Sequence, residues 1–411
     1  MSVWIALAIA MVVAAVIVEA PGLVLIAVMT AIYGSLTAVW TRYGTRRVEY
    51  SRRLATDRAV AGDSVQLDVT VWNRKPLPLP WVTAEDQVGA GLTIRERPDM
   101  QREVPPNTTL TLRNDWALAW YERVVRHFHL DELRRGSYRF GPVHLWVHDI
   151  LGRLAGEDEV AQTDTLLVAP RTAAVRHTED DVSPLGERRA RSSLTTDPAL
   201  FAGVRPFQAG DSVRQIHWRA TARLGSPVSR RLEPARGRDV VLMIDVQTVD
   251  GPYWLTWDED AFEGLCVVAA SVARRLLADG ASVGMAAASF GGSSQRIAWL
   301  PPRASLAQLT RAGELLARIR PVPSGPLSEA LAWLNRRTPP GTSIILVTAR
   351  NPGRHLAALR RMKRLGYGVE LVLLGPDASE HAQAVRLAAL RAVTATIEPG
   401  WERPDAVTLA G

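Results

Sequence analysis

The sequence predicts a mixed α/β protein with an N-terminal transmembrane helical hairpin, a small β-sandwich domain and a C-terminal doubly wound α/β domain. Three observations predict this fold class. Two runs near the N-terminus carry no charge, the middle of the chain alternates apolar and polar residues with a period of two, and the last part alternates apolar strands with amphipathic helices. The chain has 411 residues and a hydrophobic content of 47%, which is enough to bury more than one core.

The first 41 residues are expected to form the transmembrane hairpin. Residues 2–18 and 23–40 contain no charged side chain, and each run is about long enough for a helix to cross a ~30 Å hydrocarbon layer. A second apolar run follows the first at once, which is not the pattern of a signal peptide. Because arginines follow the second run, we expect a multi-pass protein of the cell membrane with cytoplasmic soluble domains. Five arginines are expected to touch anionic membrane lipids: Arg42, Arg46, Arg47, Arg52 and Arg53.

Residues 45–170 are predicted to fold as the β-sandwich. Val65, Leu67, Val69 and Val71 alternate with other residues, which indicates a strand with one buried face. Further short strands are predicted at 108–113, 124–130, 136–140, 143–148 and 165–169, a spacing typical of a sandwich. Four histidines lie on these strands: His127, His129, His144 and His148. We interpret them as residues of exposed strand faces rather than as zinc ligands.

The last part of the chain, 238–411, is predicted to be the α/β domain, and residues 171–200, which are polar and aperiodic, are expected to form an exposed linker before it. Apolar strands are predicted at 239–246, 281–289, 342–348 and 368–374, with helices between them. This alternation predicts a parallel sheet with ligands at the carboxyl ends of its strands. The only cysteine, Cys266, excludes an internal disulfide and lies on the apolar face of a predicted helix.

Between the linker and the sheet, residues 201–237 concentrate arginines and aromatic residues. In the stretch GDSVRQIHWRATARLG, Asp211 is predicted to cap a helix from Ser212 to Arg223, and Gly225 is predicted to end it. We interpret the candidate site residues of this segment as contacts to a partner or between domains, with the Trp218 indole anchoring the helix by packing. They are Arg205, Gly210, Asp211, Arg214, His217, Trp218, Arg219 and Arg223.

Two interpretations of these arginines remain open. In the first, they bind carboxylates of the β-sandwich and of the first helix of the α/β domain, such as Glu259 and Asp260, and so form a clamp that fixes the orientation of the two domains. In the second, they display a basic surface for a partner or a nucleotide phosphate. Binding of nucleic acid is less favoured, because no further aromatic residues are interleaved with the arginines. The net charge of +7 reflects an arginine-rich composition with only two lysines. No catalytic residue is predicted, because His217 has no nucleophile beside it.

Two segments of this sequence resemble a known family. GDSVRQIHWRATARLG, preceded by RPFQ and followed by VSRRLE, resembles the signature of the bacterial and archaeal domain of unknown function 58 family. RRGSYRFGPVHLWVHDILGRL resembles a companion segment upstream of that signature. The resemblance implies a membrane-anchored protein with a von Willebrand factor A-like domain and a MoxR-type AAA+ ATPase as partner. It implies no defined reaction.

A von Willebrand factor A domain binds Mg²⁺ through an Asp-x-Ser-x-Ser turn, a threonine and a second aspartate, and this resemblance therefore raises the question of a metal site. Asp245 stands at the first position, but Gln247 and Val249 replace the serines, Gly325 the threonine and Ala349 the second aspartate. One carboxylate does not satisfy a cation that demands octahedral oxygen ligands. We therefore expect a degenerate site without metal or cofactor, in which the carboxylate accepts backbone N–H bonds of its own turn.

Together these observations favour a membrane-anchored, non-enzymatic scaffold or adaptor that binds protein partners. The alternative is an envelope-associated hydrolase with a site around Asp211 and His217. A pocket that brings these two side chains within hydrogen-bond reach would favour the hydrolase.

Overall fold

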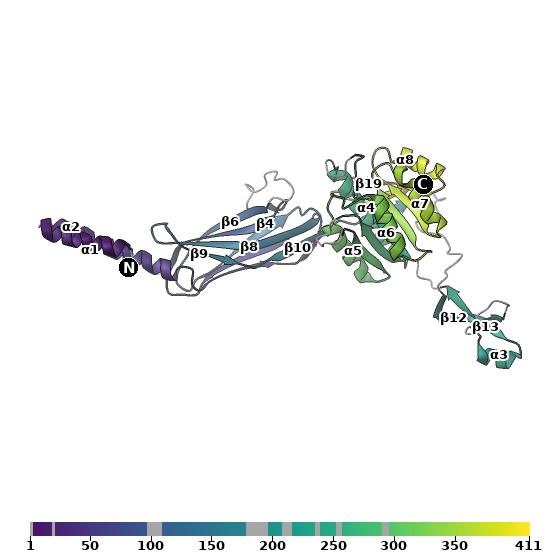
Figure 1. Ribbon diagram of the computed structural model, residues 1–411, viewed down its shortest axis with the longest axis horizontal. Coiled ribbons are helices and arrows are strands. Elements are labelled where there is room, and N and C mark those ends of the chain that lie inside the picture. Colours follow the sequence, from purple (N-terminus) through teal and green to yellow (C-terminus); the bar gives the residue numbers. More distant parts are fainter. Residues whose placement is uncertain are drawn as a thin grey trace. The chain divides into compact units, whose positions relative to one another are not determined.

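The computed structural model describes residues 3–18, 21–96, 109–177, 196–207, 216–234, 239–251, 257–289 and 296–411 (Figure 1). The chain divides into two compact units, Met1–Val168 and Ala169–Gly411. The first unit holds two helices and two sheets, and the second holds a large sheet with helices on its faces. The prediction of a mixed α/β fold is confirmed.

The N-terminal helices are α1 (Val3–Val18) and α2 (Pro21–Tyr43), and they pack against each other. Among the described helices, only α2 is long and apolar enough to cross a membrane, over Val24–Tyr43 with a mean hydropathy of 1.7. Only 22% of that span is buried, which is unlike a core helix. Helix α1 has 16 residues and reaches about 24 Å, less than a ~30 Å hydrocarbon layer. One helix thus gives a weak indication of membrane association, and a second crossing is not supported.

The rest of the first unit is two β-sheets around one core. The first sheet contains, in order, β1 (Val48–Leu54), β3 (Val65–Asn73), β7 (Arg123–Asp131) and β5 (Thr93–Ile94). The second sheet contains, in order, β2 (Arg58–Val60), β10 (Asp164–Ala169), β8 (Gly136–His148), β4 (Leu79–Gly89) and β6 (Thr109–Leu118), with β9 (Leu154–Val160) paired to β8. Strand β3 pairs antiparallel with β1 and β7, and β4 pairs antiparallel with β6 and β8.

The alternation along β3 points one face of the strand into this core. Val65, Leu67, Val69 and Val71 are all buried, at 4% exposure or less, as the period of two predicts. The sequence predicted separate strands at 136–140 and 143–148, whereas the structure has one strand, β8. The intervening Gly141-Pro142 stays within the strand, and Gly141 adopts a φ of 80° that a residue with a side chain would rarely tolerate.

Arg52 corrects an expectation about the lipid-facing arginines. Its side chain is fully buried in the sandwich, where the guanidinium bonds the carboxylates of Asp86 and Asp164. The Tyr50 hydroxyl donates to the same Asp86 carboxylate at 2.9 Å. Alternation along β1 explains this, because residues 50 and 52 both point inward. Arg52 therefore does not contact lipid.

The second unit is built on an eight-stranded sheet. In spatial order it contains β11 (Ala174–His177), β20 (Ala406–Ala410), β19 (Arg391–Glu398), β18 (Gly368–Leu373), β17 (Ser343–Thr348), β14 (Asp239–Ile244), β15 (Ser282–Ala287) and β16 (Ala298–Arg303). The five strands from β19 to β15 are parallel, whereas β16 and β20 each run antiparallel to their inner neighbour.

Helices cover both faces of this sheet. One apolar core joins the sheet to α4 (Glu259–Ala278) and α5 (Leu306–Arg318). The core on the opposite face includes α6 (Leu327–Arg337), α7 (Leu356–Arg364), which follows a short 3₁₀ turn, and α8 (Ala378–Leu387). Successive residues of β14 enter the two cores in turn, Leu242 the first and Met243 the second. Figure 1 shows α4 and α6 lying along the strands. Cys266 is fully buried in α4, as predicted.

One edge of this sheet also departs from the sequence prediction. Residues 174–177, expected within an exposed linker, form the edge strand β11, which pairs in parallel with β20. Its partner strand comes from the far end of the sequence, so no local pattern could have indicated the pairing. Strands β19 and β20 therefore both lie inside the sheet, with β11 outside them.

Candidate functional site at the strand ends

The carboxyl end of β14 lies at the point where the order of strands in the sheet reverses: the next strand in the chain, β15, lies on one side of β14, and β17 lies on the other. Strand β14 pairs in parallel with β15 on one side and with β17 on the other. Sheets of this kind bind ligands at such a switch point, beyond the carboxyl ends of the strands. Asp245 directly follows β14, while Thr348 ends β17 and Arg350 lies two residues further on.

Asp245 is bound by side chains from this neighbouring strand end. Its Oδ2 accepts hydrogen bonds from Arg350 Nε at 2.8 Å and from Thr348 Oγ1 at 3.0 Å. Its Oδ1 accepts one from a terminal guanidinium nitrogen of Arg350 at 3.3 Å. Asp245 is 4% exposed and Arg350 7% exposed. The pair is therefore a buried, two-pronged ion pair of the kind that fixes geometry as well as charge.

This contact corrects the expected role of Asp245. The prediction that its carboxylate accepts backbone N–H bonds of its own turn is wrong, because Thr348 and Arg350 side chains donate instead. A carboxylate in this interior position needs an opposite charge, and the guanidinium supplies it. Ala349 occupies the position at which a von Willebrand factor A domain has its second aspartate. The next residue, Arg350, instead places a positive charge at the end of β17.

His355 extends this ion pair. A terminal nitrogen of Arg350 donates to His355 Nε2 at 3.3 Å. Burial lowers the pKa of His355, and the nearby charge of Arg350 lowers it further. The imidazole is therefore neutral at neutral pH and accepts the hydrogen bond.

The polar side chains after Asp245 form hydrogen bonds within the loop that follows β14. The Gln247 amide donates to the carbonyls of Val249 and Gly251 at 3.1 and 2.9 Å. The Thr248 hydroxyl accepts from the backbone N–H of Asp258 at 2.8 Å. In the part of the chain that the structure describes, no group of three or more His, Cys, Asp or Glu side chains could hold a metal ion.

Mg²⁺ at physiological concentration is expected to leave the melting temperature of the full chain unchanged. Both oxygens of Asp245 accept from Arg350, and Mg²⁺ requires several oxygen ligands in octahedral geometry. Thermal unfolding with Mg²⁺ and with a chelator measures this, and Asp245→Ala serves as the control. A rise in melting temperature that depends on Mg²⁺ and disappears in Asp245→Ala would contradict the expectation.

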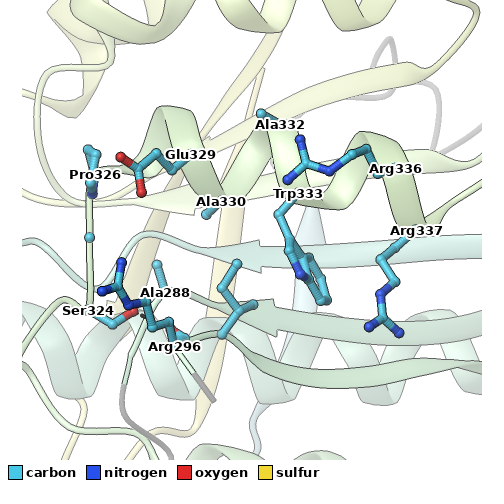
Figure 2. A pocket seen from close by; sticks show the side chains of 12 residues that line it. Ala288, Arg296, Ser324, Pro326, Glu329, Ala330, Ala332, Trp333, Arg336 and Arg337 are labelled. Carbon is cyan, nitrogen blue, oxygen red and sulfur yellow. Dashed lines mark hydrogen bonds between the residues drawn. The ribbon is translucent and has the colours of Figure 1, made fainter. Parts of the chain in front are cut away.

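A second feature lies beside α6, where twelve residues surround an open groove of about 610 Å³. The groove extends from Ala288, just after β15, along α6 to its end. Figure 2 shows Trp333 and Arg337 projecting from α6 side by side, with Arg296 near Ser324 at the other end. The guanidinium of Arg337 lies 5.1 Å from the centre of the Trp333 ring, and Trp299 meets that ring edge-on at 5.6 Å.

The charge of this groove is positive. Arg296, Arg336 and Arg337 line it, against the single carboxylate of Glu329. Within the described ranges, neither Arg296 nor Arg336 forms an ion pair. Sequence reasoning missed the groove. The available signal was Trp333 followed three and four residues later by arginines on the predicted helix, a spacing that places all three near one side.

The signature segment forms a hairpin with one short helix. Strand β12 (Thr196–Pro206) pairs antiparallel with β13 (Val228–Pro234), and Arg205 lies opposite Ser229. Helix α3 runs from Trp218 to Leu224. Of the predicted helix from Ser212 to Arg223, residues 212–215 lie outside the described residues. The described part begins later than predicted, at Trp218, because Ile216 makes a β-bridge to Ser229.

His217 caps this helix. Its Nδ1 accepts the backbone N–H of Ala220 at 3.1 Å, which is the role that the sequence had given to Asp211. At the other end, Gly225 adopts a φ of 68°, and the predicted left-handed helix end is confirmed. Gly210, Asp211 and Arg214 lie outside the described residues.

Most residues of α3 are exposed. Trp218 is 66% exposed and anchors nothing by packing, contrary to our expectation for its indole, and Arg219 and Arg223 are exposed. Neither arginine forms an ion pair with another described residue, and Asp260 instead accepts a hydrogen bond from the Trp401 indole. The clamp and the partner surface therefore both stay predictions for this segment.

The four sandwich histidines do not converge on one place. His127 and His129 lie on β7, where their Nδ1 atoms contact Asp68 and Glu96 at 2.6 and 2.7 Å. His144 and His148 lie on β8, in the other sheet, beside the rings of Trp146 and Trp81: the ring centres are 5.9 and 5.0 Å apart.

Sequence comparison supports the family resemblance. Residues 203–349 match the family model described as Protein of unknown function DUF58. This range contains α3, Asp245 and the groove residues of α6. The chain is also 26% identical over 264 residues to the uncharacterized protein YeaD of Bacillus subtilis. The match covers 62% of this chain and 58% of that protein, and neither comparison assigns an activity.

Comparison with solved structures gives only weak similarities. A CARDB domain from Pyrococcus furiosus, solved in complex with di-metal ions, has a TM-score of 0.20 and 14% identity, over 29% of this chain and 93% of that one. Spo0M, a sporulation control protein from Bacillus subtilis, has a TM-score of 0.18 and 12% identity, over 30% of this chain and 49% of that one. Similarities at these scores support no conclusion about this chain.

Proposed function

We propose that the chain is a membrane-anchored, non-enzymatic adaptor that binds a protein partner through a von Willebrand factor A-like domain. The observation that carries this proposal is the basic groove beside α6, which is lined by Trp333 and by three arginines, Arg296, Arg336 and Arg337. Tryptophan and arginine are the residues that most often dominate protein–protein interfaces. Because positive charge exceeds negative charge in this groove, we expect the partner to bind there through an acidic segment.

The Asp245–Arg350 ion pair supports binding of a partner without a metal ion between the two proteins. In this proposal the Arg350 guanidinium takes the position of a bound cation beside Asp245, so that a partner carboxylate has no Mg²⁺ to bind. The pair instead stabilises the strand ends next to the groove. Binding energy then comes from side chains of the domain itself.

The apolar helix α2 supports the anchor. Arginines follow it at once, which by the positive-inside rule makes the soluble part cytoplasmic. In this proposal α1 lies against α2 as a second, shorter apolar segment. The partner that the family resemblance implies is a MoxR-type AAA+ ATPase.

Reversing charge in the groove tests the proposal. The double substitution Arg336→Glu with Arg337→Glu is expected to weaken binding of the partner roughly tenfold or more, about 1.4 kcal/mol, because it opposes an acidic segment. The measurement is co-purification of the full chain in mild detergent with a MoxR-type ATPase from the same organism. Affinity follows from titration of the purified pair.

The matched control is Arg360→Glu with Arg361→Glu on α7. Both residues are exposed and lie outside the groove, so this variant makes the same change in net charge. An equal loss of affinity in both variants indicates an effect of net charge alone and contradicts the assignment of the groove as the binding site. Failure of any ATPase to enrich contradicts the assigned partner.

A further inference from the structure

One end of the sandwich exposes apolar and aromatic side chains at two turns. The turn between β6 and β7 presents Trp120 and Tyr121, which are 67% and 62% exposed. The turn between β8 and β9 presents Ile150 and Leu151, at 47% and 59%, and Leu154 follows at 56%. Exposed large apolar residues gathered at one end of a soluble domain mark an interaction surface.

This end of the sandwich is attached to α2. The Trp40 indole donates to the Pro78 carbonyl at 3.1 Å. The buried Lys75 ammonium donates to the carbonyls of Gly44 and Arg46, both at 2.8 Å, just after the helix ends. Burial lowers the pKa of Lys75 to about 8, so at neutral pH the charged donor still predominates. The sandwich therefore begins directly at the base of the helix.

One contact joins the β8–β9 turn to α2. A terminal guanidinium nitrogen of Arg153 donates to the Tyr33 hydroxyl at 2.7 Å. Tyr33 lies ten residues before Tyr43, where α2 ends, which is about 15 Å along the helix axis. Since Tyr33 belongs to the apolar span Val24–Tyr43, the side chain of Arg153 reaches along the helix to the level of that span. The turn itself extends beside α2 rather than away from it.

The β8–β9 turn is locally ordered. Asp149 is 4% exposed, and its Oδ1 accepts the backbone N–H groups of Leu151 and Arg153 at 2.9 and 3.0 Å. Gly152 adopts a φ of 75°, which closes the turn. The Asp149 carboxylate, which would be repelled by anionic lipid, is therefore buried and hydrogen-bonded within the turn. The side chains of Ile150 and Leu151 remain exposed on its surface.

The charges around the two turns suit the boundary of a bilayer. Arg42 and Arg46 lie over the Tyr43 ring, 5.8 and 5.5 Å from its centre, at the end of the apolar span. The acid in the β6–β7 turn, Glu122, accepts the backbone N–H of Ala119 at 2.6 Å. Tryptophan, tyrosine and arginine beside an apolar span are typical of the layer of lipid headgroups.

We propose that the β6–β7 and β8–β9 turns insert Trp120, Ile150 and Leu151 into the headgroup layer of a bilayer that contains anionic lipid, as a second membrane contact beside α2. This inference rests on the proposed membrane anchor. It adds that the sandwich is held against the lipid surface rather than suspended from it.

Site-specific fluorescence quenching in the full chain tests this contact. A single cysteine is introduced as Leu151→Cys or Trp120→Cys, labelled with an environment-sensitive maleimide fluorophore and reconstituted into phosphatidylcholine–phosphatidylglycerol vesicles. Cys266 is fully buried in the folded protein and does not compete for the label. Lipids with a nitroxide in the headgroup layer are expected to quench both labels, with a blue shift of their emission relative to protein in detergent.

Two further cysteine variants separate the possible failures. Thr56→Cys lies in the exposed loop beyond β1, seven residues of strand away from the helix end, and is expected to stay unquenched. Leu36→Cys lies in α2 and reports the anchor itself when the lipids carry the nitroxide on the acyl chain. If Leu36→Cys is quenched while Leu151→Cys and Trp120→Cys behave like Thr56→Cys, the turn contact is wrong and the anchor stands. If Leu36→Cys is also unquenched, the anchor fails and the contact fails with it.

Discussion

Replacing Asp245 with alanine is expected to destabilise the α/β unit by about 3–5 kcal/mol, because it leaves the buried Arg350 guanidinium without its partner. Arg350 is only 7% exposed, so water does not compensate the charge. The loss should appear as faster hydrogen exchange of the amides in β14 and β17, the two strands that the pair joins. The exchange is measured on the full chain in detergent.

Two variants show whether charge burial is the cause. Asp279→Ala breaks the exposed Arg275–Asp279 pair on the surface of α4, and a loss of no more than about 0.5 kcal/mol is expected there. Combining Asp245→Leu with Arg350→Met removes both charges and should recover much of the stability, since buried ion pairs tolerate apolar replacement. If Asp245→Ala and Asp279→Ala have equal effects, the ion pair does not stabilise the strand ends.

Replacing Arg52 with methionine is expected to destabilise the sandwich by about 3–5 kcal/mol at neutral pH, and the loss should shrink in acid. Arg52 and Asp86 are both almost fully buried, so the variant leaves Asp86 as an unpaired buried carboxylate. Burial raises the pKa of Asp86, while the charge of Arg52 opposes that rise. Without Arg52 the pKa of Asp86 rises further.

The direction of this pH effect follows from proton binding. A carboxyl group with a raised pKa holds a proton in the folded state that it releases on unfolding. Its stabilising effect is complete below the ordinary aspartate pKa and is lost as pH rises through the folded pKa. The Arg52→Met variant should therefore regain stability relative to the native chain on acidification. Pulse proteolysis in urea, at neutral and mildly acidic pH, measures the difference.

Arg74→Met is the matched control for this pH dependence. Arg74 and its partner Glu49 are both about half exposed, so water screens the remaining charge. Little change in stability and little dependence on pH are expected. An Arg52→Met deficit that stays constant as pH falls would show that the lost side-chain packing, rather than the uncompensated carboxylate, causes the destabilisation.

Local patterns predicted the elements of this fold better than its contacts. The alternation in β3 and the amphipathic pattern of α4 each describe a single segment, and both elements form where expected. The start of α3 was misplaced because Ile216 pairs with Ser229 across a hairpin, and a capping rule that considers only neighbouring residues cannot include that bridge.

The candidate site depended on contacts between distant residues. Asp245 was recognised from the sequence, but its partner Arg350 is 105 residues away, and only the pairing of β14 with β17 brings the two together. The groove likewise combines Ala288 and Arg296 with the side chains of α6. Positions 210, 211 and 214 lie outside the described residues, and the roles predicted for them stay predictions.

The pairing of β11 with β20 has a consequence for synthesis. Ribosomes make residues 174–177 long before residues 406–410, so the edge of the sheet formed by β11 has no hydrogen-bonding partner while the intervening strands are translated. Non-local pairings of this kind are slow to form and leave unpaired strand edges open to aggregation in the meantime. Nascent chains halted before β20 should therefore depend on chaperones more than the finished protein does.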